Sequence, residues 1–143
     1  MTELPFGYIL RAVHHWATHF MVASVFLHMC RVYFTGAYRN PRELNWLIGV
    51  ALMFLTIFFG YSGYLLPWDS LAYGAAVIGI NMANSSPLIG KFAATALFSG
   101  TSLTPGTVTR MYFIHVFILP VIVTLLIIIH LLIVWVQGIA EPH

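Results

Sequence analysis

Four histidines form two pairs with nearly equal spacing. His14 and His28 are fourteen residues apart, and His115 and His130 are fifteen apart. On a helix these intervals fall about 40° short of four turns and about 60° past them, and each separates its two rings by roughly 21 Å along the axis. Two such helices can hold two flat cofactors at two depths. The spacing therefore predicts two b-type haems, each ligated by two histidines.

For a single histidine on an apolar helix, an ordinary buried polar role is the more frequent alternative. Ionisable side chains inside membrane helices are costly and usually functional. Four histidines in matched pairs therefore favour haem ligation.

Two further histidines do not fit this spacing. His15 lies about 140° and His19 about 180° around the helix from His28, so neither shares its face. The two are four residues apart and could hold a metal ion together, but two ligands do not complete a site. We interpret them as interfacial or supporting residues.

The composition excludes a soluble fold. Of 143 residues, 60% are hydrophobic and 7% charged, with a mean hydropathy of +0.90, which predicts an integral membrane protein. Six basic and four acidic residues are too few to attract nucleic acid. The single cysteine, Cys30, excludes an internal disulfide and is interpreted as a small packing residue. The first hydrophobic stretch is too long for a signal peptide and lacks a cleavage site.

We expect an all-α transmembrane fold, a three-helix part of a haem-binding bundle, with spans at about residues 9–34, 46–66 and 111–136. Arginines after the first span mark the negative (cytoplasmic) side. Pro120 predicts a local kink in the last span, which offers a reason for its longer histidine interval. With three spans His14 pairs with His115 and His28 with His130. A fourth span would exchange the pairs, and histidine depth alone does not decide between them.

The segment 69–110 is more polar than the spans. A further span at about residues 71–90 would place Asn81, Asn84 and two serines deep in lipid. We therefore expect short helices lying at the membrane interface.

Two glycines of the second span repeat the histidine interval. Gly49 and Gly63 are fourteen residues apart, so they share one face at two depths. Glycine on a membrane helix usually serves close helix packing. The matched interval favours clearance for two haem edges.

Several motifs carry a family resemblance: RAVHHW, FLHMCRVYFTGAY, NPRELNW, GYSGYLLPWD and TRMYFIHVFILP. The chain resembles cytochrome b of quinol-oxidising cytochrome bc complexes over essentially residues 1–143. It is most similar to the N-terminal haem-binding half in its split chloroplast-type and bacterial form. The resemblance implies that His14 and His115 ligate a haem near the positive side, and His28 and His130 one near the negative side.

The resemblance also implies a function. We expect a di-haem electron-transfer subunit, inactive alone, of a quinol:cytochrome c or plastocyanin-like acceptor oxidoreductase. The expected partners are a C-terminal cytochrome b half on another chain, a Rieske-type iron–sulfur protein, a c-type cytochrome, quinol and membrane lipid, in a dimeric complex. Other chains would supply the family's first helix and its quinol-oxidation loop. The resemblance leaves the presence of a third haem undecided, although Cys30 does not lie at the position where relatives attach one. We favour a bacterial inner membrane over a thylakoid.

Three arginines lie near the expected haem edges. Arg11 and Arg31 are each three residues outward of a histidine, on the same helix face, and Arg110 lies at the start of the last span. They are candidates for pairing with haem propionates. The alternative is that arginines at span ends extend to the interface.

Two functions of other classes remain open. One is a di-haem membrane anchor of a dehydrogenase or hydrogenase, which would exchange electrons with a soluble partner. The other is a haem-free scaffold or metal-ion transporter subunit built around His14, His15 and His19.

Overall fold

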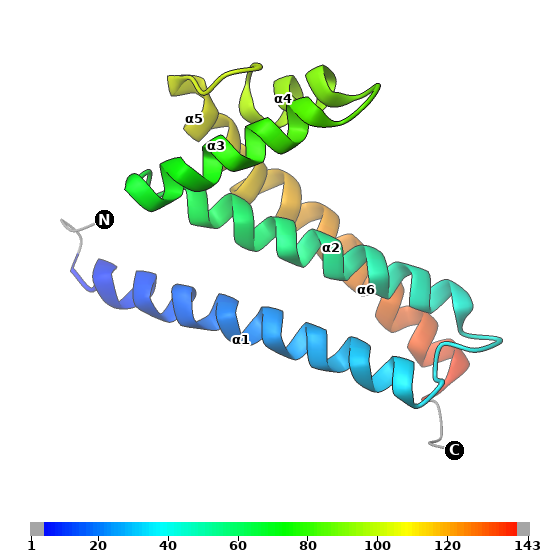
Figure 1. Ribbon diagram of the computed structural model, residues 1–143. Coiled ribbons are helices and arrows are strands. Elements are labelled where there is room, and N and C mark those ends of the chain that lie inside the picture. The colour runs from blue at the N-terminus through cyan, green and yellow to red at the C-terminus, as the bar shows by residue number, and fades with distance from the viewer. Residues whose placement is uncertain (1–4, 140–143) are drawn as a thin grey trace. The chain divides into compact units, whose positions relative to one another are not determined.

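The computed structural model describes residues 5–139, and within them every regular element is helical (Figure 1). In chain order these are α1 (Gly7–Phe34), α2 (Glu43–Leu65), α3 (Ser70–Ser85), α4 (Gly90–Phe98), α5 (Pro105–Phe113), the π-helical turn η1 (Ile114–Ile118) and α6 (Leu119–Gln137). The predicted all-α class is confirmed.

The chain divides into two compact units. The first comprises residues 1–57 and 125–143, and the second comprises residues 58–124. The boundary passes through α2 and α6.

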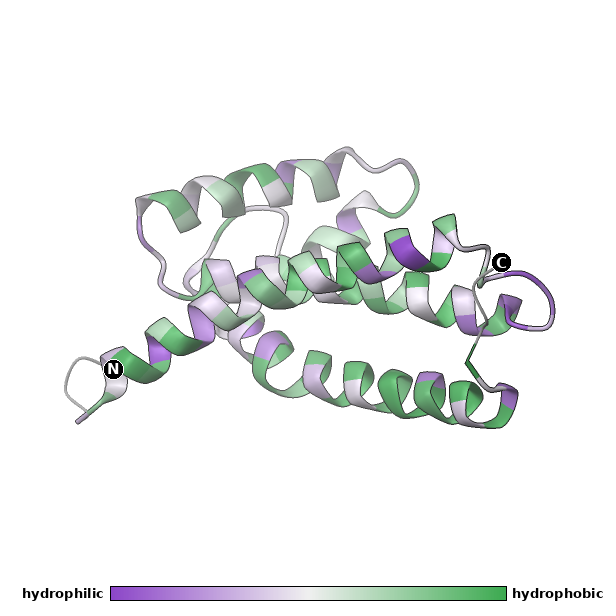
Figure 2. Ribbon diagram, turned by 90° about the horizontal axis from the view of Figure 1, so that it is seen from below, coloured by the Kyte–Doolittle hydropathy of each residue, from purple (hydrophilic) through white to green (hydrophobic). Residues whose placement is uncertain are grey.

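Within residues 5–139, two helical segments are long and apolar enough to cross a membrane: Glu43–Leu65 and the continuous run Pro105–Gln137. Their side chains are mostly exposed, as expected for helices that face lipid. Figure 2 shows apolar residues along the whole length of the long helices. These segments correspond to the predicted second and third spans.

α1 has 28 residues, which is long enough to cross a bilayer. It is not among the segments that are both long and apolar enough within the described residues. Its four histidines and two arginines, spread along the whole helix, lower its hydropathy. The predicted first span at residues 9–34 therefore matches a helix and stays a prediction as a span.

The last helical run begins earlier than predicted because its start is well capped. Pro105 occupies the first turn, where its missing N–H is not needed. The backbone N–H of Thr104 donates to Thr107 Oγ1 at 3.0 Å, as in a capping box. The irregularity expected around Pro120 takes the form of the π-helical turn Ile114–Ile118, which ends two residues before it. Proline removes a helical hydrogen bond and crowds the preceding turn.

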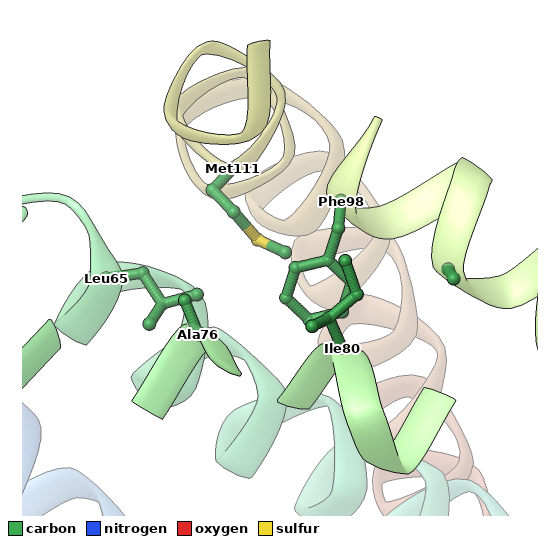
Figure 3. Packing of buried hydrophobic residues seen from close by; sticks show 6 residues of the cluster. Leu65, Ala76, Ile80, Phe98 and Met111 are labelled. Carbon is green, nitrogen blue, oxygen red and sulfur yellow. The ribbon is translucent and has the colours of Figure 1, made fainter. Parts of the chain in front are cut away.

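The second unit has an apolar core between its short helices. It consists of Leu65 from α2, Ala76 and Ile80 from α3, Ala94 and Phe98 from α4, and Met111 from α5. In Figure 3, Met111 points toward Phe98, which lies against Ile80. α3 and α4 have 16 and 9 residues, fewer than the roughly 20 that a bilayer requires. Short helices are thus observed, and their location at the interface stays a prediction.

One close contact fixes α3 against α2. Tyr61 Oη donates to the carbonyl of Ala75 at 3.0 Å, and the phenol group occupies the space that a Cβ on Gly79 would need. Only glycine allows this approach. Asp69 begins α3 by accepting a hydrogen bond from the Ala72 N–H at 2.8 Å, a typical N-cap.

Candidate functional site

His115 is held against α2 by three residues of the second unit. Its ring is 9% exposed and lies in the π-helical turn. Nδ1 is 3.0 Å from Ser62 Oγ, and the ring meets Phe59 edge-on with ring centres 4.5 Å apart. A Cβ at Gly63 would lie 2.6 Å from His115 Cε1. Gly63 therefore provides clearance for the histidine ring itself.

His130 lies beside Gly49 in the first unit. A Cβ at Gly49 would be 3.6 Å from His130 Cε1 and 3.9 Å from Met29 Sδ, which are ordinary contact distances. His130 Nδ1 is buried without a well-aligned hydrogen bond, although the backbone of Asn45 hydrogen-bonds to the ring in a less favourable geometry. A buried polar atom so weakly satisfied is uncommon in native structures.

His28 and His130, a pair predicted from the three-span arrangement, come close together. Their ring centres are 6.5 Å apart and their planes are nearly perpendicular, at 84°. Two imidazoles on opposite sides of one metal ion have ring centres about 6 Å apart, given about 2 Å per metal–nitrogen bond and about 1.1 Å from nitrogen to ring centre. The observed separation fits this arrangement.

A cavity of about 220 Å³ adjoins this pair. Its lining includes His28, His130, Gly49, Arg31 and Arg42. The lining therefore contains two of the predicted ligands, one predicted glycine and one predicted arginine. It also contains Arg42, which was not predicted as a site residue.

Several buried polar atoms in the cavity lining lack hydrogen bonds. These are Arg42 Nε, Asn45 Oδ1, Gln137 Oε1 and His130 Nδ1. Arg42 Nη2 donates to the Gln137 carbonyl at 3.4 Å, and Gln137 Nε2 donates to the Pro41 carbonyl at 3.0 Å. The guanidinium is thus held at the cavity with its buried Nε donor unused. Guanidinium groups suit carboxylate and phosphate partners, so the residues present fit a cofactor with anionic side groups.

The residues of the other predicted pair, His14 and His115, belong to different units. His14 lies on α1 in the first unit, and His115 lies in the second. Their pairing at the positive side therefore stays a prediction.

The predicted arginines differ in their surroundings. Arg31 lines the cavity, Arg11 is exposed on α1, and Arg110 Nη1 donates to the Ala96 carbonyl at 3.0 Å. Part of the Arg110 guanidinium is thus engaged by α4. A role with propionates stays a prediction for all three.

His15 and His19 lie side by side on α1. Their ring centres are 4.7 Å apart, and His19 Nδ1 is 2.7 Å from the His15 carbonyl oxygen. Among the described residues, no group of three or more histidine, cysteine or acidic side chains could hold a metal ion. Cys30 is a free thiol, partly buried.

Ser62 was not predicted as a site residue from the sequence. A serine beside a glycine on an apolar helix is typical of close packing. Its contact with His115 joins residues 53 positions apart. The only sequence signal was a hydroxyl next to one of the two spaced glycines.

A family model described as cytochrome b (N-terminal)/b6/petB matches residues 19–143. Cytochrome b6 of Heliobacterium modesticaldum is 43% identical over 140 residues, which are 98% of this chain and 66% of the relative. Cytochrome b6 of Emiliania huxleyi is 42% identical over 142 residues, which are 99% of this chain and 66% of the relative. The chain thus spans about two thirds of the length of these relatives. Together with the apolar helices, the similarity confirms an integral membrane protein of the split type. The chain belongs to the family of cytochrome b N-terminal domains that includes cytochrome b6.

Proposed function

We propose that this chain is the di-haem electron-transfer subunit of a quinol-oxidising membrane complex. The single observation that carries the proposal is the His28–His130 pair, whose ring centres lie 6.5 Å apart beside a cavity that contains Gly49 and two arginines. Membership in the cytochrome b family gives this geometry its chemical interpretation.

The residues of the cavity would serve three tasks. His28 and His130 would hold the haem iron through their imidazoles, and Gly49 leaves space for a flat ring between helices. Arg31 and Arg42 would balance anionic propionates at the membrane boundary. The haem, when bound, supplies a one-electron carrier. The protein sets its orientation, its solvent exposure and the charge around it.

His14 and His115 would form the second site, near the positive side. His115 is already held by Phe59, Ser62 and Gly63, so this ligand is preorganised on α2 and η1. Two such sites at two depths would carry electrons from quinol oxidation at the positive side to a quinone at the negative side.

The proton acceptor for quinol oxidation would lie outside the described residues. Such a base must lie within hydrogen-bond reach of the substrate hydroxyl. Of the two carboxylates in the described residues, Asp69 caps α3 through a 2.8 Å hydrogen bond, and Glu43 begins α2 in the loop proposed for the opposite side. Glu3 and Glu141 lie outside the described residues.

The proposed complex therefore contains several further components. These are a C-terminal cytochrome b half, a Rieske-type iron–sulfur protein and a c-type or plastocyanin-like acceptor, in a dimer within a bacterial inner membrane.

A haem count on the purified chain tests the cofactor proposal. We expect a b-type α band in the reduced-minus-oxidised spectrum and two haems per chain. His28→Ala and His130→Ala should remove the same spectral component, whereas His14→Ala and His115→Ala should both remove the other. Absence of any b-type band would favour a haem-free scaffold. Loss of one component by both His14→Ala and His130→Ala would refute the pairing.

A second experiment separates the proposed complex from a dehydrogenase or hydrogenase anchor. Mass spectrometry of the chains that purify with this subunit should identify an iron–sulfur protein and a c-type cytochrome. Quinol:cytochrome c activity of the complex should respond to inhibitors of both quinone sites. A soluble dehydrogenase or hydrogenase as the main partner would contradict the proposal.

A further inference from the structure

Ser62 is the polar group of α2 that contacts a proposed haem ligand. Its side chain is completely buried, at 0% exposure. Ser62 Oγ lies 2.9 Å from the Phe59 carbonyl oxygen and 3.0 Å from His115 Nδ1. All three residues belong to the second unit.

The hydrogen count assigns the direction of both bonds. A serine hydroxyl has one hydrogen to donate and two lone pairs to accept with. The Phe59 carbonyl can only accept, so the hydroxyl hydrogen is committed to it. Ser62 Oγ must then accept from His115, which places a hydrogen on Nδ1. In the neutral ring the lone pair is consequently on Nε2, the atom that would bind a metal.

We propose that Ser62 is a positioning residue that fixes the tautomer of His115 and lowers the midpoint potential of the haem that His115 ligates. This inference rests on the proposed function, because it requires His115 to be an axial ligand.

The expected direction follows from the electron density of the ring. A hydrogen bond accepted from Nδ1–H makes a ligating imidazole more basic. A more basic axial ligand stabilises the oxidised metal and so lowers the midpoint potential. The site is buried among apolar groups, where the hydrogen bond is electrostatically stronger than in water.

The effect should be confined to one of the two haems. Among the described residues, no hydroxyl takes the place of Ser62 at His130: Nδ1 has no well-aligned hydrogen bond, and the backbone of Asn45 acts on the ring instead. Removing the Ser62 hydroxyl should therefore leave the haem at His130 unchanged.

The competing explanation is that Ser62 is only a small residue for helix packing. Alanine would fill that role equally well. The two explanations therefore differ in what happens to the midpoint potential when the hydroxyl is removed.

The test is redox titration of the assembled complex carrying Ser62→Ala, Ser62→Thr or the control Ser24→Ala. Ser24 is an exposed α1 hydroxyl that bonds to the Phe20 and Met21 carbonyls. Ser62→Ala should raise the midpoint potential of the component that His115→Ala removes and leave the other unchanged. Ser62→Thr should retain the original potential, and Ser24→Ala should shift neither.

Each outcome decides something. An unchanged potential in Ser62→Ala, or an equal shift of both haems, would overturn the role of Ser62 and leave the haem proposal standing. Absence of haem from the wild-type protein would overturn the proposed function instead. If Ser62→Ala loses the haem, the midpoint potentials of Ser62→Thr and Ser62→Val are compared instead. Valine has the shape of threonine without the hydroxyl, so this comparison also isolates the hydrogen bond.

Discussion

Replacing Gly63 with alanine should displace His115 from its position on α2. The added Cβ would lie 2.6 Å from His115 Cε1 and 3.2 Å from both ring nitrogens. Because favourable carbon contacts lie at about 3.5–4.0 Å, the ring or the helix must move by roughly 1 Å. Such overpacking costs about 1–3 kcal/mol. The same movement would stretch the 3.0 Å hydrogen bond to Ser62.

The chain offers two matched controls on the same helix. A Cβ at Gly60 has nothing within 4 Å, so Gly60→Ala should be neutral or should stabilise α2 by up to about 1 kcal/mol. A Cβ at Gly49 would meet His130 Cε1 at 3.6 Å, an ordinary contact, so any loss in Gly49→Ala would come from the cofactor edge proposed for that space rather than from a displaced histidine.

The assay is the amount of each haem component retained per chain during a thermal ramp, followed at the α bands. A cost of about 1–3 kcal/mol corresponds to a roughly 5- to 150-fold weaker retention of the His115 haem in Gly63→Ala. Gly49→Ala should affect only the His130 component. Retention in Gly63→Ala equal to that in Gly60→Ala would refute the steric reasoning.

Two further predictions concern other contacts. Arg42→Gln should lower the midpoint potential of the His28–His130 haem by tens of millivolts, because a cation beside the site favours the reduced, more negative state by on the order of 1–2 kcal/mol. Redox titration beside the exposed control Arg39→Gln checks this, and equal shifts would contradict it. Gly79→Ala should destabilise the protein by about 1–3 kcal/mol through its clash with Tyr61, whereas Gly74→Ala, with nothing within 4 Å, should not. Thermal unfolding in detergent measures the difference, and Tyr61→Phe should partly rescue Gly79→Ala.

Helical periodicity explains why part of the site was predictable. A fixed rotation and rise per residue place residues on a face and at a depth, and that was enough to select His28 and His130 as partners once three spans were assumed. Periodicity does not identify contacts across helices. Ser62 and Arg42 were missed because their roles depend on which side chains of other segments approach them.

For α1, the residues that predict the site make the helix harder to recognise as a membrane span. Hydropathy measures the cost of placing side chains in lipid, and the histidines that carry the proposed chemistry raise that cost. A helix that binds cofactors through ionisable residues therefore looks less like a span the more ligands it contains. Its partners, rather than its own composition, must compensate for those groups.

The π-helical turn at Ile114–Ile118 gives a physical reason for the unequal histidine intervals. A π-turn closes its hydrogen bonds from residue i to i+5, so it takes in one more residue than an α-turn. A helix that contains one such turn needs one additional residue to complete the same number of turns. The run from His115 to His130 begins inside the π-turn, whereas α1 is regular throughout. Fifteen residues on the last helix are therefore the counterpart of fourteen on the first, and the position of His115 depends on a local irregularity that Pro120 favours.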